Sequence, residues 1–155
     1  MGDRAHVYTI QEHGGIYIRT GYRGTGLPLL VREALRHMAT HRMFYFDRNE
    51  DHRGEFFDYL AFPAVFTRLA ADCQDHLRDL SIAWHVWDNE WPVLVIDPAN
   101  LRLGTAPPPR DESDMQQPMP EDKDWVSFKW FITEATDQEI NAWWKISREA
   151  WVRTK

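Results

Sequence analysis

The chain has 155 residues, and 18 Lys plus Arg against 24 Asp plus Glu give it a formal net charge of −6 at pH 7. This length fits one domain over residues 1–155, and 43% hydrophobic residues supply enough apolar surface for a core, which excludes an intrinsically disordered chain. The acidic balance argues against a general binder of duplex DNA or of anionic membranes. One cysteine cannot form an internal disulfide, and no signal-like or membrane-spanning apolar segment is visible, so we expect a soluble cytoplasmic protein.

The first part of the chain predicts a β-hairpin followed by a helix. Apolar and polar residues alternate over 6–10 and again over 16–20, as expected for two antiparallel strands joined by a short turn. Glycines then interrupt the pattern over 21–26. From 27 to 38 the apolar residues share one helical stripe, and Pro28 suits the first helical turn. The stripe comprises Leu27, Leu30, Val31, Ala34, Leu35 and Met38.

The middle of the chain alternates between strand and helix patterns. Aromatic and apolar residues at 43–46 favour a short buried strand. Helical spacing returns between about 55 and 79, and because Pro63 interrupts it, we expect two helices there. Residues 82–87 and 92–96 flank an Asp-Asn-Glu turn and predict a second hairpin.

A proline-rich segment separates these elements from the C-terminal part. After a short expected strand at 100–103, residues 106–124 contain five of the nine prolines and six acidic residues against two basic ones, so this loop carries −4 of the net charge. A strand is expected at 126–132, and Thr136 and Glu139 form a capping-box pattern that opens a final helix. Together these elements predict an α+β fold, with a mixed, mostly antiparallel sheet packed with four or five helices.

The junction between the second strand and the first helix is the most informative segment for function. Gly24, Thr25 and Gly26 precede the helix, where backbone N–H groups and the positive end of the helix dipole can hold a phosphate. Arg19 and Arg23 would add charge-assisted contacts. The order G-x-x-G-x-G differs from the two common phosphate-binding fingerprints, and an ordinary strand-to-helix turn is the structural alternative.

Residues 16–62 resemble part of the GNAT-type N-acyltransferase superfamily. The acetyl-CoA-binding motif of that superfamily runs roughly Arg/Gln-x-x-Gly-x-Gly/Ala between a strand and a helix, and this chain matches its frame at Arg23 and Gly26. A second similarity lies downstream, where the family has a strand, an Asn and a helix ending Tyr-x-x-Leu-Gly-Phe. Here Asn49 follows the expected strand, and the corresponding ending is the FDYLAF segment at 57–62.

The resemblance implies that the chain binds acetyl-CoA or another acyl-CoA and transfers the acyl group directly to an amine. The backbone of Ile18 would pair with the pantetheine of the cofactor. The loop from Arg23 to Gly26 would hold the pyrophosphate, and Asn49 would touch the cofactor. A fold that binds the cofactor without catalysing transfer is equally compatible with the motif.

The resemblance also implies an acid and a base. Phe57 stands where the family often has the tyrosine that protonates the departing thiolate, and Tyr59 would replace it. Glu12, His13 and His85 are the candidate bases that would deprotonate the incoming amine. Residues 1–15 leave little room for the strands and helices that the family places before its cofactor strand, so the acceptor-binding half would be missing or would come from the C-terminal part.

Two metal-like patterns are visible, and we expect neither to bind a metal. His37 and His41 lie four apart on the expected helix, which suits a solvated face near a helix end, where positive charge is favoured. The Asp-x-Asn-x-Asp run at 47–51 imitates a calcium loop, but His52 occupies the place that requires Gly.

Eight tryptophans are many for a chain of this length. Trp143, Trp144 and Trp151 lie on an arc of the expected C-terminal helix that is too wide for a narrow core stripe. A packed aromatic core explains them, and so does a surface for a protein partner or a homodimer, because Trp is a favoured interface anchor. The alternative function is therefore a small acidic protein-binding module, of inhibitor or immunity type.

Overall fold

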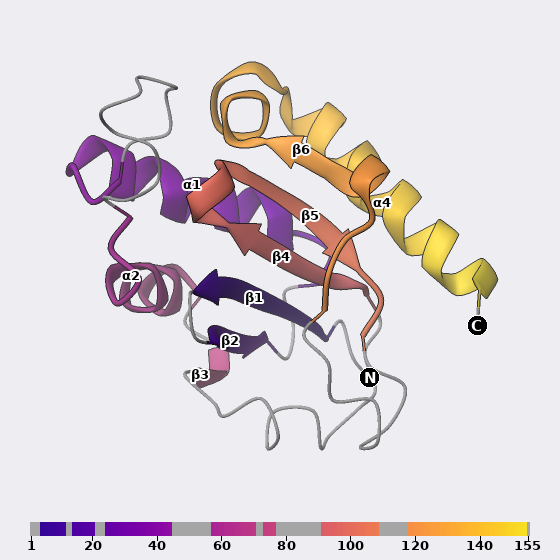
Figure 1. The fold of residues 1–155 in the computed structure, drawn as a ribbon, viewed down its shortest axis with the longest axis horizontal. Helices are drawn as coiled ribbons and strands as arrows, with labels where there is room; N and C mark the ends of the chain where they lie inside the picture. The colour runs from indigo at the N-terminus through magenta and orange to yellow at the C-terminus, as the bar shows by residue number, and fades with distance from the viewer. Residues whose placement is uncertain are drawn as a thin grey trace.

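The computed structural model describes residues 4–11, 14–20, 24–44, 57–70, 73–76, 91–108 and 118–154. Six strands form one sheet in the order β3-β2-β1-β4-β5-β6 (Figure 1). Their bounds are β1 Ala5–Gln11, β2 Gly14–Thr20, β3 Cys73–His76, β4 Val93–Asp97, β5 Arg102–Ala106 and β6 Trp125–Ser127. β1 and β4 pair in parallel, and the other four neighbouring pairs are antiparallel. The expected α+β class and the mixed, mostly antiparallel sheet are confirmed.

The helical elements differ in length and type. Within the described ranges the α-helices are α1 Leu27–Thr40, α2 Ala61–Leu69 and α4 Asp137–Thr154. One π-helical turn, η4, spans Trp130–Glu134, and two short 3₁₀ turns are η2 Pro98–Asn100 and η3 Asp122–Asp124.

The N-terminal hairpin forms as its alternation predicts. β1 and β2 pair from Ala5 opposite Thr20 to Gln11 opposite Gly14. Gly15 is required beside the turn, because a Cβ at this position would overlap the ring of Tyr8 and approach the carbonyl of Thr9.

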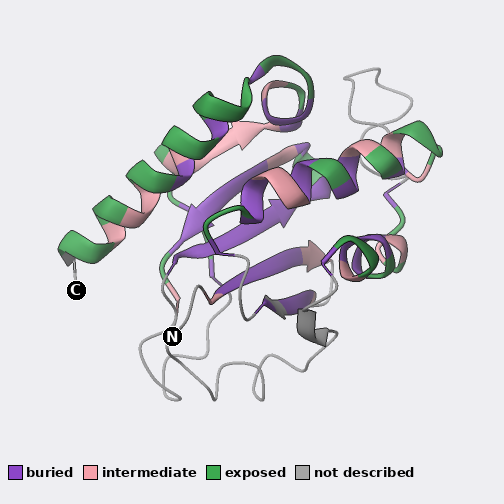
Figure 2. Ribbon diagram, turned by 180° about the vertical axis from the view of Figure 1, so that it is seen from behind, coloured by how far each residue is buried: buried purple, intermediate pink, exposed green. Residues whose placement is uncertain are grey.

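The main core lies between one face of the sheet and helices α1 and α4, which lie on the same side of it (Figures 1 and 2). Inward residues of alternate strand positions, such as Val7, Ile18, Leu94 and Ile96, are fully buried. The α1 stripe is confirmed: its members are buried except Leu30, which packs against the core while partly exposed. Arg32 is buried among them, although the apolar stripe did not include it.

The opposite face of the sheet carries a second cluster. Its buried members are Tyr8, Tyr17, Val93, Val95 and Ala106, with Ile10 and Trp125 partly buried beside them. The end of the proline-rich loop packs here too, since a Cβ on Gly104 would lie 2.7 Å from the carbonyl of Asp124 and 3.0 Å from Pro120. Pro118 and Pro120 are buried, so the C-terminal end of this loop contributes to the packing of the fold.

The region after α1 corrects two expectations. Residues 43 and 44 are not in a strand, and 45–56 lie outside the described residues. The helix expected before Pro63 is absent over 57–60, because the Asp58 carboxylate accepts hydrogen bonds from the N–H groups of Leu60 (3.1 Å) and Ala61 (3.0 Å) and so starts α2 later. Pro63 sits in the first turn of α2, where a missing N–H costs nothing.

The next elements correct the helix and hairpin expected further on. The chain returns to the sheet at β3, where residues 73–76 had been expected in a helix. β4 forms as expected, but β1 and β5 occupy its two edges, so its hairpin partner is β5. The other expected hairpin strand, 82–87, lies outside the described residues.

The segment from 126 to 132 changes type at Ser127. β6 ends there, and the Ser127 hydroxyl accepts a hydrogen bond from the N–H of Trp130 at 3.1 Å. The following π-helical turn is closed by the N–H of Ala135 donating to the carbonyl of Trp130 at 2.8 Å. The expected strand over the whole segment is therefore wrong beyond residue 127. The capping box is confirmed, with Thr136 and Glu139 exchanging two hydrogen bonds.

Candidate functional site

β2 ends at Thr20, and the described part of the glycine loop, residues 24–26, leads directly into α1. The Gly24 carbonyl accepts hydrogen bonds from the N–H of Leu27 at 3.3 Å and from the indole Nε1 of Trp144 at 2.7 Å. Gly26 is the N-cap of α1, with no side-chain hydrogen bond capping the helix. Thr25 and Gly26 are exposed, whereas Gly24 is buried. The junction is thus held in place by a residue of α4, 120 positions further along the chain.

This junction offers few N–H groups to an anion. Pro28 has no N–H, and the N–H of Leu27 is already bonded to Gly24. A Cβ built on Gly26 meets no atom within 4 Å, and the backbone of Gly26 has φ −100°, which other residues adopt without strain. There is thus open space beside the start of the helix, and neither backbone geometry nor crowding requires glycine at position 26.

Ile18, whose backbone was expected to pair with pantetheine, is placed less favourably. Ile18 is fully buried, and it pairs with Val7 on one side and with His76 on the other. Pantetheine could pair with the Ile18 backbone only if one neighbouring strand moved away. The backbone of Arg19 pairs in the same strand, while its side chain lies outside the described part of the structure, as do Arg23 and Asn49.

The candidate acid, Tyr59, does not lie at the glycine junction. Tyr59 follows Asp58, whose N–H donates to the Met43 carbonyl just beyond the end of α1. Because α1 has 14 residues, Tyr59 and Gly26 lie at opposite ends of a helix about 20 Å long. Glu12, His13 and His85 lie outside the described residues.

The surroundings of Tyr59 make it a weaker acid than an ordinary tyrosine. Its side chain is half-buried, with its ring centroid 5.1 Å from that of Phe57. Burial raises the pKa of Tyr59 above its usual value of 10.0, and the negative charge of Asp97 raises it further. Tyr59 therefore holds its proton through neutral pH, where it can donate a hydrogen bond but does not act as a base.

A polar cluster near the end of β4 was not predicted. Asp97 is only 4% exposed, and its Oδ2 accepts hydrogen bonds from Asn100 and from Nε of Arg102, each at 2.9 Å. The Arg102 guanidinium also lies 3.9 Å from the ring centroid of Trp125. A buried apolar run ending in Asp was the available sequence signal. The cluster closes the β4–β5 connection, where Leu101 adopts a left-handed backbone with φ 53°, so we assign it a structural role.

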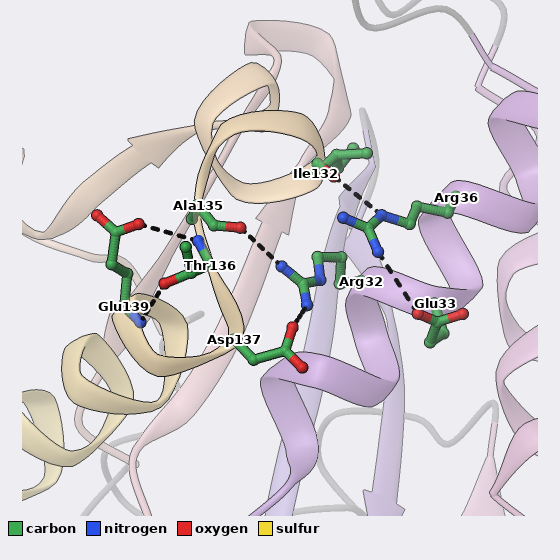
Figure 3. Close-up of polar contacts among 8 residues, drawn as sticks. All are labelled: Arg32, Glu33, Arg36, Ile132, Ala135, Thr136, Asp137 and Glu139. Atoms are coloured by element: carbon green, nitrogen blue, oxygen red, sulfur yellow. Dashed lines mark hydrogen bonds and ion pairs between the residues drawn. The ribbon is translucent and has the colours of Figure 1, made fainter.

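A second unpredicted network joins α1 to the segment before α4 (Figure 3). Buried Arg32 donates to the Ala135 carbonyl at 3.0 Å and forms an ion pair with Asp137. Arg36 donates from Nε to the Ile132 carbonyl at 2.9 Å. The two arginines thus satisfy carbonyl groups around the end of the π-helical turn, where helix carbonyls lack partners of their own. The network anchors α4 against α1.

The tryptophans of α4 separate into two groups. Trp144 is 1% exposed and stacks on Trp91, with ring centroids 5.2 Å apart and planes 3° from parallel. It belongs to the core, which is one of the two explanations that the sequence left open for this residue. Trp143 and Trp151 are half-buried. Trp143 meets Trp130 and Phe131 edge-on, at the border between core and surface.

The outer side of α4 carries apolar residues as well. Ile146 is 64% exposed, and Ala142 and Ala150, one turn before and after it, are also exposed. Figure 2 shows exposed residues along the whole length of this helix. Ile146 lies at the centre of the strip, and half-buried Trp143 borders it. Ile146 was not among the residues of this helix that the sequence predicted to form a binding surface.

The two histidines near the end of α1 lie close together. The rings of His37 and His41 lie 4.2 Å apart near the end of α1, and no group of three or more metal-ligating side chains occurs among the residues the structure describes. No helix within those residues is long and apolar enough to cross a membrane. Comparisons of the chain with protein-family models, with curated proteins and with solved structures found no match.

Proposed function

We propose that the chain is a small protein-binding module and that the outer face of α4 is its binding surface. The observation that carries the proposal is the strip formed by Ala142, Ile146 and Ala150, which are all exposed although α4 already buries Ile140 and Trp144 on its other side. A helix that serves only its own core has polar residues on its outer face. An apolar strip opposite the core face instead suits contact with a second protein.

The physical advantage of such contact can be estimated. Burying an isoleucine side chain contributes about 1.5–3 kcal/mol, and small neighbours let a partner approach the helix closely. Trp143 lies beside the strip and is half-buried, so it needs little additional ordering to contribute an amphipathic surface. The strip is held rigidly, because Trp144 and the Arg32–Asp137 ion pair fix α4 on the core. A pre-organised surface loses less conformational entropy on binding.

A matched pair of substitutions tests this surface. Ile146→Asp places a charge in the strip, and Leu60→Asp places the same charge on a leucine that is 74% exposed near α2. Wild-type and variant proteins would be used to retrieve partners from a lysate of the source organism, and the retrieved protein would then be purified and its affinity measured. We expect a partner that binds wild type and Leu60→Asp and loses at least about tenfold in affinity for Ile146→Asp. Equal binding to all three proteins would contradict the proposal.

Acyl-CoA binding at the glycine junction is the second candidate. Its specific support is the open space beside Gly26 at the start of α1, together with the GNAT-like spacing of Arg23 and Gly26. Calorimetric titration of CoA and acetyl-CoA against wild type, Arg23→Ala and Gly26→Ala tests it. Binding by wild type that weakens in both variants supports this candidate, and no heat of binding to wild type refutes it.

A further inference from the structure

The exposed residues of α4 are placed symmetrically on either side of Ile146. Five exposed residues, Glu139, Ala142, Ile146, Ala150 and Arg153, lie within an arc of about 80° on the helix. Ile146 is at the centre, the two alanines are four residues away on either side, and the two charged residues are seven away. The charges at the two ends have opposite signs.

This arrangement fits a second copy of the same helix packed antiparallel about a two-fold axis at Ile146. In such a pair each Ile146 faces its counterpart. Each Ala142 then lies opposite Ala150 of the other copy, and each Glu139 opposite Arg153. A two-fold interface requires a self-complementary patch of this kind, since residue i contacts residue j and j contacts i. A parallel arrangement would instead bring like charges together, which is unfavourable.

We infer that the chain forms a homodimer through antiparallel contact of two α4 helices, centred on Ile146. The partner is a second copy of the chain, because one antiparallel register brings opposite charges, small residues and the two Ile146 side chains opposite one another at the same time. The alanines allow the helix axes to approach closely, and Ile146 supplies the apolar contact that is removed from water. The inference rests on the proposed role of α4 as a binding surface and names the partner.

Charge exchange tests the register. Arg153→Glu leaves two acidic residues facing each other at both ends of the dimer, and Glu139→Arg does the same with two basic residues. We expect either change to weaken self-association roughly 5- to 30-fold, because each dimer contains two such contacts. The double variant Glu139→Arg/Arg153→Glu restores opposite charges across the interface and regains most of the association. Sedimentation velocity over a range of protein concentrations measures each dissociation constant.

The controls separate association from folding and from the general proposal. Glu139 also takes part in the capping box, which Arg153→Glu leaves intact, so circular dichroism must show that Glu139→Arg and the double variant lose helix stability equally. Ile146→Asp should remain monomeric at every concentration. A wild-type protein that stays monomeric, or a double variant no tighter than the single ones, overturns the homodimer. Failure of the homodimer leaves the partner comparison of Ile146→Asp with Leu60→Asp to decide the proposed function.

Discussion

Trp144→Phe tests whether Trp144 stabilises the fold as a core residue or serves as a surface residue for binding a partner. In the structure the indole Nε1 donates to the Gly24 carbonyl at 2.7 Å, and the ring stacks on Trp91 with centroids 5.2 Å apart. Phenylalanine cannot donate the hydrogen bond and has a smaller ring. Of the two hydrogen bonds to the Gly24 carbonyl that the described residues make, the substitution leaves the one from the Leu27 N–H at 3.3 Å.

The expected loss can be estimated from these contacts. Removing the partner of a buried polar group costs about 1–3 kcal/mol. The smaller ring also loses part of the packing that makes complete removal of a buried Trp cost about 3–5 kcal/mol. Together the free energy of unfolding should fall by about 2–4 kcal/mol, which corresponds to a decrease of about 5–15 °C in Tm for a chain of this size.

Urea unfolding followed by far-ultraviolet circular dichroism measures the loss without relying on tryptophan fluorescence. Trp143→Phe is the matched control, because Trp143 is the adjacent residue of the same helix and is only half-buried. We expect the control to lose about 1 kcal/mol or less. A loss below about 1 kcal/mol for Trp144→Phe, or equal losses for the two variants, would refute the assignment of Trp144 to the core.

Three other perturbations test separate parts of the structure. Gly104→Ala should lower the free energy of unfolding by about 1–3 kcal/mol in urea unfolding, because the added Cβ would lie 2.7 Å from a backbone oxygen. Gly26→Ala, whose Cβ would meet open space, should change the free energy of unfolding by less than about 0.5 kcal/mol. Similar values for the two variants would contradict the packing described for Gly104. Because the pKa of Tyr59 is raised in the folded protein, the stability that Tyr59 contributes below pH 10.0 is lost as the pH rises toward its folded-state pKa. Tyr59→Phe should therefore lose less stability than wild type in that pH interval. Parallel plots of the free energy of unfolding against pH for the two proteins would refute this. Asp137→Asn should lower the free energy of unfolding by only about 0.5–1 kcal/mol, and by less in high salt, because the Asp137 side chain is 71% exposed although its partner Arg32 is buried. A loss of stability that does not depend on salt would contradict this prediction.

The sequence predicted elements whose signals are local. The alternation of the first hairpin, the apolar stripe of α1 and the Thr136–Glu139 capping box all appear in the structure. The wrong predictions involved competing local interactions. Asp58 delays α2 by bonding its first N–H groups, and Ser127 ends a segment whose aromatic residues favour a strand. Side chains of this kind change an element boundary without changing the apolar pattern around it.

Contacts between distant segments were less predictable than the elements themselves. The glycine junction was found from its sequence, but its bond to Trp144 joins residues 120 positions apart. The burial of Arg32 likewise depends on the carbonyl of Ala135, 103 positions away. The distance between Tyr59 and Gly26 follows from where the chain returns after α1. One-dimensional spacing contains no direct record of such pairings, so the role of Trp144 stayed open between core and surface.

Cysteine cross-linking tests the proposed α4 surface most directly. In a background where Cys73 is replaced by Ser, Ile146→Cys places a thiol on the two-fold axis, and Asn141→Cys places one at an exposed position about 140° around the same helix. On mild oxidation we predict rapid formation of a disulfide-linked dimer by Ile146→Cys and little by Asn141→Cys, measured by non-reducing electrophoresis. Equal cross-linking of the two variants, or none by Ile146→Cys, would contradict antiparallel association through α4.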